Sequence, residues 1–516
     1  IGWSAGLLAL LMPLSGLLGV LALPDVPLVM AALLCLDAVA RLRERITWGG
    51  LLTLAAALVI GALSHYRFGL VIAAGLAGLL CDRQGRRLLR DARVWLALLA
   101  GMLGWLPLLL WNLGHDGAGL RFQLLERNPW AFHAEGLAWL PIQFLLVTPA
   151  LFVLLLATLR EAWHRRRDDD RQPWGLVAGV ASVSVLGYFL LGFFVDDTRV
   201  SFHWPVSGWL VLVIAAPVVA IRWHGAARSS VPALAGIGML GATVFLAAAS
   251  QATSRSSLAG SRFYPADFSG RQEIAERARQ LRPDPQSTIV AGDFALGAGL
   301  AFALDRADIR VLDSPLNHKH GRAGQLQQWR LQLDELAQAP SAPVLLIIDD
   351  TATAMKHRLA VYHQLCEVFG ALPAPEVMNV DHGRKRYLIY RIDSLDKRSG
   401  CNAPALAYVD SPLAKATVPS RFTMAGWAFK DGAGLSKVEV TIDGVVVATA
   451  DYGQAMPNVA EYWRISNDPH QPDVGFKAEV DASAFSPGMH WLGLRLHGVD
   501  GTVEQWAEQP IRIVPP

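Results

Sequence analysis

The first half of the chain is an almost continuous series of apolar runs separated by short polar breaks. Nine runs approach the roughly 20 apolar residues that a helix needs to cross a bilayer. They cover about 3–22, 26–41, 47–63, 67–81, 94–112, 137–158, 174–194, 205–221 and 231–250. The pattern predicts a polytopic helical membrane domain over residues 1–250.

Basic residues are distributed unevenly between the breaks. The connections at 41–45, 81–93, 160–173 and 221–230 together hold 15 Arg and Lys, whereas the alternate connections hold 4. Because Arg and Lys are retained on the cytoplasmic side, the first set is predicted to be cytoplasmic. The alternate set, and all residues after Ala249, are then predicted to face the periplasm or exterior.

The predicted outer breaks carry polar residues that the topology rule does not require. "FVDDTRVSFHWP" (194–205) holds two Asp, an Arg and a His between two apolar runs. The same side collects Asp25, His65, Tyr66, Arg67, Trp111, Asn112, His115, Asp116, Arg121, Gln123, Asp196, Asp197, Arg199, His203 and Trp204. A single such loop is explained by solvation and an aromatic belt. Four on one side favour a shared polar site, because ionisable groups at membrane depth are costly and usually functional.

The residue types in these breaks suit a phosphate-bearing lipid. Arg67, Arg121 and Arg199 offer planar donors to phosphate oxygens, and carboxylates such as Asp25 offer a general base. "GAGLAF" (297–302) lacks the lysine of a nucleotide-binding loop. A polyprenyl-phosphate sugar, with its head at the interface and its tail in lipid, is the donor that these features favour.

The second half of the chain has the composition of a soluble protein. Residues 251–392 alternate helical and strand-like runs and predict a small extracytoplasmic α/β domain. Residues 393–402 are a polar linker. Residues 403–516 contain short strands with turn signals, among them the Asp443–Gly444 hairpin, and predict an immunoglobulin-like β-sandwich.

The loop "NHKHGR" (317–322) is the most basic short segment of the α/β region. Its residues His318, Lys319, His320 and Arg322 are predicted to bind substrate by contacting lipid headgroups or the acceptor. A solvated loop is the plain alternative, and two His without a third ligand are weak grounds for a metal site.

Composition narrows the function classes further. The net charge of +2 and the lack of a basic, aromatic stripe give no support for nucleic-acid binding. The four cysteines show no metal-binding spacing. Cys366 and Cys401 can pair if the tail is extracytoplasmic, although a lone buried cysteine is commoner.

Several of these motifs, in this order and spacing, resemble one family of membrane enzymes. They are "LALPDVPLVMAALLCLDAVARL", "ALSHYRFGLVI", "LPLLLWNLGHDGAGLRFQL" and "FHWP", followed by "TIVAGDFALGAGLAFAL" and "SPLNHKHGRAGQLQQW" in the second half. The pattern is similar to integral-membrane (GT-C) glycosyltransferases of the dolichyl-phosphate-mannose-protein mannosyltransferase type, glycosyltransferase family 39. Bacterial relatives of this type include the lipid A aminoarabinose transferases. The resemblance covers about residues 1–392, with His65 where relatives have Lys and His203 where Asn is usual.

The resemblance implies inverting transfer of a sugar from a polyprenyl-phosphate donor to an extracytoplasmic acceptor: lipid A, a protein or a wall polymer. It gives Asp25, Asp196 and Asp197 catalytic roles. Substrate binding is assigned to His65, Tyr66, Arg67, Asn112, His115, Arg121, Gln123, Arg199, His203 and Trp204. No cofactor is certain, and a divalent metal ion is the one candidate. Arg199 is expected to hold the lipid phosphate, unless it merely pairs with Asp197.

The family's main catalytic aspartate follows its first span and has no counterpart here, since Asp25 matches the second acidic position. Because Ile1 already lies in an apolar run, missing N-terminal spans are expected. The alternatives are a non-catalytic relative, a transporter of lipid-linked sugars, or an accessory protein with a binding tail. The predicted location is the bacterial inner membrane, multi-pass, with the C-terminal domains outside.

Overall fold

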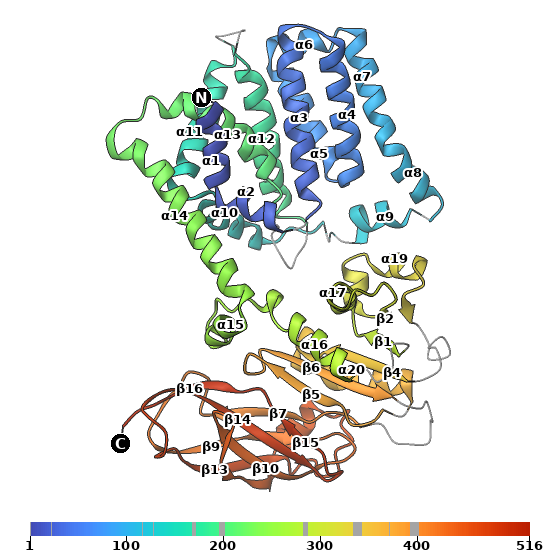
Figure 1. Ribbon diagram of the computed structural model, residues 1–516, viewed down its shortest axis with the longest axis vertical. Coiled ribbons are helices and arrows are strands. Elements are labelled where there is room, and N and C mark those ends of the chain that lie inside the picture. Colours follow the sequence, from blue (N-terminus) through green and yellow to red (C-terminus); the bar gives the residue numbers. More distant parts are fainter. Residues whose placement is uncertain are drawn as a thin grey trace. The chain divides into compact units, whose positions relative to one another are not determined.

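The computed structural model describes residues 2–21, 23–115, 117–126, 128, 130–167, 172–195, 202–281, 287–333, 343–370, 372–392 and 402–515. The chain divides into two compact units, residues 1–246 and 247–516. The first is helical, and the second combines a mixed α/β sheet with a β-sandwich (Figure 1). Helical spans, an α/β part and a β-rich C-terminal part are therefore confirmed.

All nine apolar segments fold as helices or as parts of helices. The elements of this helical unit are α1 Gly2–Leu11, α2 Pro13–Val20, α3 Asp25–Glu44, α4 Trp48–Ser64, α5 Phe68–Cys81, α6 Arg83–Leu88, α7 Ala92–Met102, η1 Leu103–Trp105, α8 Leu106–Leu113, α9 Ala118–Arg121, η2 Phe122–Glu126, η3 Ala134–Ala138, α10 Trp139–Val147, α11 Pro149–Arg165, α12 Trp174–Leu191, α13 Val206–Ala220 and α14 Gly225–Ser250.

Two of the predicted spans are not continuous helices. The segment 3–22 bends by 68° between α1 and α2, and the segment 137–158 bends by 108° between α10 and α11. Each second helix begins with proline, Pro13 or Pro149, and Thr148 has a φ of 74°. Proline lacks the N–H that a continuing helix needs and disfavours helical geometry in the residue before it.

Fewer helices than predicted meet the length and composition of a full span. Among the described residues, Ala92–Leu113, Trp174–Leu191 and Gly225–Ser250 do so, and the two bent pairs raise this number to five. The helices α4, α5 and α13 are apolar but shorter, and α3 carries charges at both ends and in its middle. The number of crossings therefore stays a prediction, whereas a membrane protein with several crossing helices is confirmed.

Close helix packing holds the centre of the helical unit together. Helix α5 packs along α12, and α3 packs along α4. A Cβ on Gly179 of α12 would lie 2.6 Å from the Cα of Gly78 on α5, so the small residues permit this approach. The two helices thereby fix the position of the polar residues at their ends.

The second unit begins with helices and a six-stranded sheet. Its elements are α15 Ala252–Leu258, η4 Ala266–Phe268, α16 Arg271–Leu281, β1 Thr288–Ala291, α17 Phe294–Leu304, β2 Arg310–Leu312, α18 Pro315–Lys319, α19 Ala323–Gln328, β3 Gln332–Leu333, β4 Val344–Asp349, η6 Asp350–Ala352, α20 Met355–Phe369, β5 Glu376–Val380 and β6 Lys385–Ile392.

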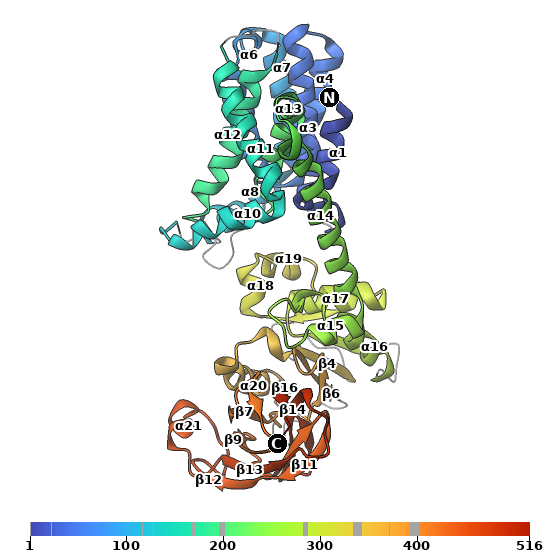
Figure 2. The same cartoon turned by 90° about the vertical axis from the view of Figure 1, so that its left-hand side faces the viewer.

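The strands of this sheet lie in the order β3-β2-β1-β4-β6-β5 (Figure 2). The first four are parallel, and β6 and β5 are antiparallel. Alternate residues of β4 enter two cores. Leu345 and Ile347 pack with α16 and α17, whereas Leu346 and Ile348 pack with α20. This two-residue period is that of a strand covered on both faces.

The remaining strands form two sheets, with the orders β11-β10-β14-β16-β8 and β12-β13-β9-β7, and β15 pairs with β14. They are β7 Leu406–Ser411, β8 Thr417–Val418, β9 Arg421–Phe429, β10 Leu435–Ile442, β11 Val445–Thr449, β12 Asp451–Gln454, β13 Gly475–Asp481, β14 Gly488–Gly498, β15 Val503–Gln505 and β16 Gln509–Ile513, with α21 at Pro457–Tyr462. Residues from both sheets share one core, as a sandwich requires. Asp443 and Gly444 both have positive φ in the predicted hairpin turn.

The cysteines divide into two kinds. Cys35 and Cys81 are free, in agreement with their interpretation as small apolar residues. Cys366 on α20 is disulfide-bonded, so the expectation of a lone buried thiol is wrong for this residue. Cys401, its predicted partner, lies outside the described residues.

Candidate functional site

A buried ion pair forms the centre of the candidate site. Asp25 is the first residue of α3 and is 2% exposed. Its Oδ2 accepts a hydrogen bond of 2.9 Å from Nη2 of Arg67, which precedes α5. A carboxylate at a helix N-terminus is favoured by the helix dipole, and the guanidinium compensates its charge. Sequence reasoning selected both residues but did not predict that they pair.

The turn before α13 completes this cluster. Nε2 of His203 lies 3.5 Å from the same Asp25 oxygen, and the ring of Trp204 lies 4.9 Å from the guanidinium carbon of Arg67. The ring of Tyr188 on α12 lies 5.8 Å from that of Trp204. We call Asp25, Arg67, Tyr188, His203 and Trp204 the Arg67 cluster. Four segments far apart in sequence meet there.

Arg67 has unused bonding capacity within this cluster. Its Nε is buried and has no hydrogen-bond partner among the residues that the structure describes. A buried donor without a partner is costly, by about 1–3 kcal/mol. A bound anion would remove that cost, and a guanidinium is well suited to phosphate.

A second set of predicted residues is joined by hydrogen bonds next to Arg67. The buried Asn112 of α8 donates to the hydroxyl of Tyr66 (3.1 Å) and accepts from the backbone N–H of Leu120 (2.9 Å). Nδ1 of His65 accepts from the backbone N–H of Arg67 (3.0 Å). Asn112 and Tyr66 thus attach the α8–α9 turn to the segment that carries Arg67.

The remaining predicted residues of the helical unit form their own local contacts. His115 stacks on Trp111 with ring centroids 4.5 Å apart, and Arg121 pairs with Glu126 at the surface. The backbone carbonyl of Gln123 accepts from Asn128. Asp116, Asp196, Asp197 and Arg199 lie outside the described residues, so their predicted roles stay predictions.

Two residues of this region were missed by sequence reasoning. Gln143, fully buried on α10, donates to the carbonyl of Phe202 (2.6 Å) and accepts from the indole of Trp209 (2.8 Å). It thereby holds the turn that presents His203 and Trp204. Tyr188 is the other. Each is an isolated polar group inside an apolar run, which is the signal that points to them.

The basic connections gather at the opposite ends of these helices. Arg43 binds Asp82 through two hydrogen bonds (2.8 and 3.1 Å) and also donates to the carbonyl of Gln172. Arg222 pairs with Glu161. The two predicted sets of connections therefore form separate groups, as the alternation required. Which group is cytoplasmic stays a prediction.

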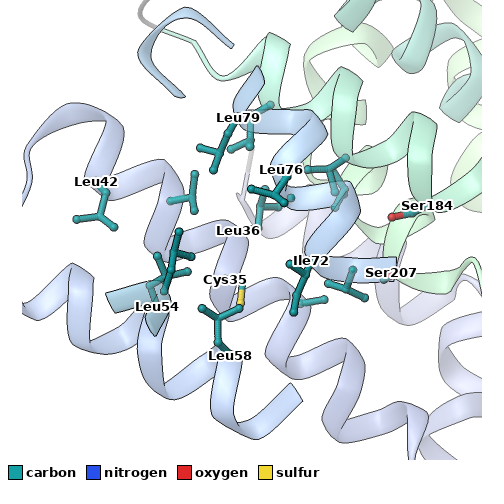
Figure 3. A pocket seen from close by; sticks show the side chains of 18 of the residues that line it. Cys35, Leu36, Leu42, Leu54, Leu58, Ile72, Leu76, Leu79, Ser184 and Ser207 are labelled. Atoms are coloured by element: carbon teal, nitrogen blue, oxygen red, sulfur yellow. The ribbon is translucent and has the colours of Figure 1, made fainter. Parts of the chain in front are cut away.

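An apolar pocket extends through the helical unit from the cluster side (Figure 3). It has a volume of ≈ 90 Å³ and is lined by residues of α3 to α7, α12 and α13. Its polar lining atoms come from Ser184 and Ser207, which Figure 3 shows at one side, away from Leu42 and Leu79. Ser184 lies one helical turn from Tyr188, so this side of the pocket adjoins the Arg67 cluster.

The described residues do not fit a metal centre here. They contain no group of three or more His, Cys, Asp or Glu able to hold an ion. Asp25 is the carboxylate of the cluster, and Arg67 already engages it. No step through a metal is derived.

The predicted residues of the second unit lie around α18. His318 pairs with Asp313 at 2.8 Å, and the ring of His320 lies 5.4 Å from that of Phe294. The guanidinium of Arg322 lies 6.0 Å from the same Phe294 ring. Lys319 ends α18 and is exposed. These residues form a basic, partly aromatic surface.

Comparison with known proteins supports the family resemblance over part of the chain. The family model described as dolichyl-phosphate-mannose-protein mannosyltransferase matches residues 1–111. This range contains Asp25, His65, Tyr66 and Arg67. No curated protein matches the chain.

Among solved structures, the chain is similar to the crystal structure of ArnT from Cupriavidus metallidurans bound to undecaprenyl phosphate. The identity is 13%, over 76% of this chain and 79% of that chain, with a TM-score of 0.46. Fibronectin(III)-like modules of Clostridium thermocellum CbhA match at 13% identity over 27% of this chain and 60% of that chain, with a TM-score of 0.16. An endo-beta-1,4-mannanase from Thermotoga petrophila matches at 10% identity, over 49% and 61%, with a TM-score of 0.17.

Proposed function

We propose that this chain, which belongs over residues 1–111 to the dolichyl-phosphate-mannose-protein mannosyltransferase family, transfers a sugar from a polyprenyl-phosphate donor to an extracytoplasmic acceptor with inversion. The acceptor is lipid A, a protein or a cell-wall polymer. The observation that carries the proposal is the buried Arg67–Asp25 pair, in which Nε of Arg67 has no partner among the described residues.

Arg67 is the proposed phosphate-binding residue. In the reaction, the acceptor oxygen or nitrogen forms a bond to the anomeric carbon while the bond from that carbon to the lipid phosphate breaks. Negative charge then collects on the leaving phosphate. Donors aimed at developing charge in a water-poor site are the largest single contribution to many catalysed rates. Arg199 is proposed as a second phosphate ligand.

Asp25, Asp196 and Asp197 are the proposed acidic groups. One of them accepts the proton of the attacking acceptor group, because an aligned general base removes that proton as the bond forms. Asp25 also positions Arg67, since its Oδ2 accepts the Nη2–H bond. His203, 3.5 Å from that oxygen, is positioned to relay the proton.

The remaining parts of the donor have matching surfaces. Aromatic rings such as Trp204 and Tyr66 suit the faces of a sugar, and His65, Asn112, His115, Arg121 and Gln123 are proposed to contact the sugar or the acceptor. The apolar pocket beside Ser184 and Ser207 suits a short stretch of the isoprenoid tail.

The Arg67 cluster is proposed to face the periplasm of a bacterial inner membrane. The opposite helix ends carry the Arg-rich connections, which are typical of the cytoplasmic side. The disulfide at Cys366 supports an oxidising compartment for the second unit.

A transfer assay in proteoliposomes tests the proposal. Membranes containing the chain are incubated with radiolabelled polyprenyl-phosphate sugars and with lipid A, protein or wall acceptors. We expect transfer that Arg67→Ala reduces about 100- to 1,000-fold, as removal of one charge-stabilising donor does. Arg41→Ala, which removes an exposed pair with Asp37, is the matched control. Transfer that is unaffected by Arg67→Ala would contradict the proposal.

A further inference from the structure

The second unit carries an exposed apolar surface built on α17 and α19. Helix α17 has the sequence FALGAGLAFAL, without a single polar side chain. Its inner residues Gly297 and Leu300 are buried, but Phe302 is 92% exposed, the largest value of any large apolar side chain in the described part of this unit. Trp329, which follows α19, is 61% exposed. Apolar residues on two adjacent elements form one patch.

A groove runs between these two helices. It has a volume of ≈ 730 Å³ and is lined by apolar residues of α17, such as Ala298 and Ala301, and by Leu326 and Trp329 beside them. Phe302 lies one helical turn from Ala298 and extends the lining outward. We call residues 294–304 and 314–333 the α17–α19 face.

The charge of this face has one sign. Residues 294–304 and 314–333 contain Lys319, Arg322 and Arg330 and no Asp or Glu. All three basic residues are exposed. The neighbouring acidic residues are engaged elsewhere, since Asp308 pairs with Arg306 and Asp313 pairs with His318.

An apolar surface rimmed by Arg and Lys is typical of proteins that lie on anionic membranes. We propose that the α17–α19 face docks on the bilayer surface, with Phe302 and Trp329 in the headgroup boundary and Lys319, Arg322 and Arg330 on lipid phosphates. This inference does not depend on sugar transfer.

The chain itself supports a bilayer as the occupant. Helix α14, long and apolar enough to span a membrane, ends at Ser250, and β1 of the same unit begins at Thr288. This covalent link keeps the face at high effective concentration near lipid. A second copy is a poorer occupant, because a symmetric contact would bring two surfaces of the same positive sign together.

Spin-label accessibility in nanodiscs tests the proposal on the full chain. Cys35 and Cys81, the free cysteines, are replaced by Ala, and a nitroxide is attached at Ala295→Cys, an exposed position of α17 that leaves Phe302 and Trp329 intact. A label at Val445→Cys, at the exposed end of a sandwich hairpin, is the control. Collision with oxygen reports lipid, and collision with a nickel chelate reports water.

In nanodiscs containing phosphatidylglycerol, we expect the oxygen-to-nickel ratio at 295 to exceed that at 445 several-fold. Phe302→Ser lowers it. Lys319→Glu, Arg322→Glu and Arg330→Glu each weaken docking about fivefold, because each basic residue near an anionic surface contributes a similar amount. Added salt and pure phosphatidylcholine weaken docking in the unsubstituted protein, so the test does not require that the Glu variants fold.

Two results would overturn the inference. A label at 295 that is as accessible to nickel as the label at 445, in anionic nanodiscs, shows that the face stays in water. A label protected from both oxygen and nickel shows that protein, from another chain or a second copy, covers the face instead of lipid.

Discussion

The helical unit contains two buried Arg–Asp pairs at opposite helix ends, and they differ in what they leave unsatisfied. At the Arg-rich end, Arg43 and Asp82 are each 4% exposed and share two hydrogen bonds. Asp82 also caps α6 through Gly85, and Arg43 binds the carbonyl of Gln172. At the other end, Arg67 and Asp25 share one hydrogen bond, and Arg67 retains an unpartnered buried Nε among the described residues.

This difference separates a structural pair from a binding pair. Three segments depend on Arg43 and Asp82 for their positions, and their bonding capacity is used within the protein. Arg67 instead lies between a carboxylate, an aromatic face and an unsatisfied donor, and its side chain is 16% exposed. A guanidinium held in this way can accept phosphate oxygens without losing its support.

The largest expected effect concerns the structural pair. Arg43→Ala leaves Asp82 buried without its partner, and breaking a buried pair costs about 3–5 kcal/mol. We expect a clear loss of thermal stability in detergent, measured by the unfolding temperature, with transfer per folded molecule retained. Unchanged stability would remove the distinction between the two pairs.

Asp25→Asn is expected to act in the opposite way. The amide is nearly the same size and its oxygen can still accept from Arg67, so the fold is retained. The charge is lost, and with it the alignment of Arg67 and a proposed base, which together account for about 100-fold in rate. Transfer rates and unfolding temperatures of Asp25→Asn and Asp82→Asn, measured side by side, check this, and a mainly structural loss in Asp25→Asn would count against it.

Trp204→Leu removes the ring that covers Arg67. A cation–π contact that is shielded from water contributes about 1–2 kcal/mol, so we expect transfer to fall about tenfold. Trp204→Phe keeps an aromatic face and serves as the conservative control. Equal losses in the two variants would indicate that packing against Tyr188, not the cation, is what matters.

Gln143→Leu tests the support of the turn before α13. Loss of the bonds to Phe202 and Trp209 leaves buried polar groups unpaired, at about 1–3 kcal/mol. We expect a modest loss of stability and a few-fold loss of transfer, because His203 and Trp204 become less firmly placed. A loss of stability with unchanged transfer would limit Gln143 to a structural role.

Much of the architecture follows from the sequence alone. Apolar runs, strand alternation and the Asp443–Gly444 turn identify the helices, the mixed sheet and the sandwich, because each has a local period. The bends at Pro13 and Pro149 were visible as prolines, but hydrophobicity alone joined the segments on either side. Their separation depends on backbone geometry that an average over a window does not register.

The candidate site was predictable residue by residue but not as an arrangement. Asp25, Arg67, His203 and Trp204 were singled out because polar groups are unusual beside apolar runs. That Asp25 and Arg67 pair, across 42 positions, depends on the packing of α3, α4 and α5. The sequence directed the phosphate to Arg199, which lies outside the described residues, whereas the described geometry favours Arg67.

The most direct test of the central claim is the affinity for polyprenyl phosphate itself, without sugar or acceptor. Native mass spectrometry or titration in nanodiscs can compare the unsubstituted chain with Arg67→Lys and Arg43→Lys, two matched substitutions at the two ends. The account predicts that Arg67→Lys weakens binding about tenfold or more, because a lysine cannot supply the planar fork, and that Arg43→Lys leaves it unchanged in folded protein. Equal affinity in the unsubstituted chain and Arg67→Lys would contradict the account.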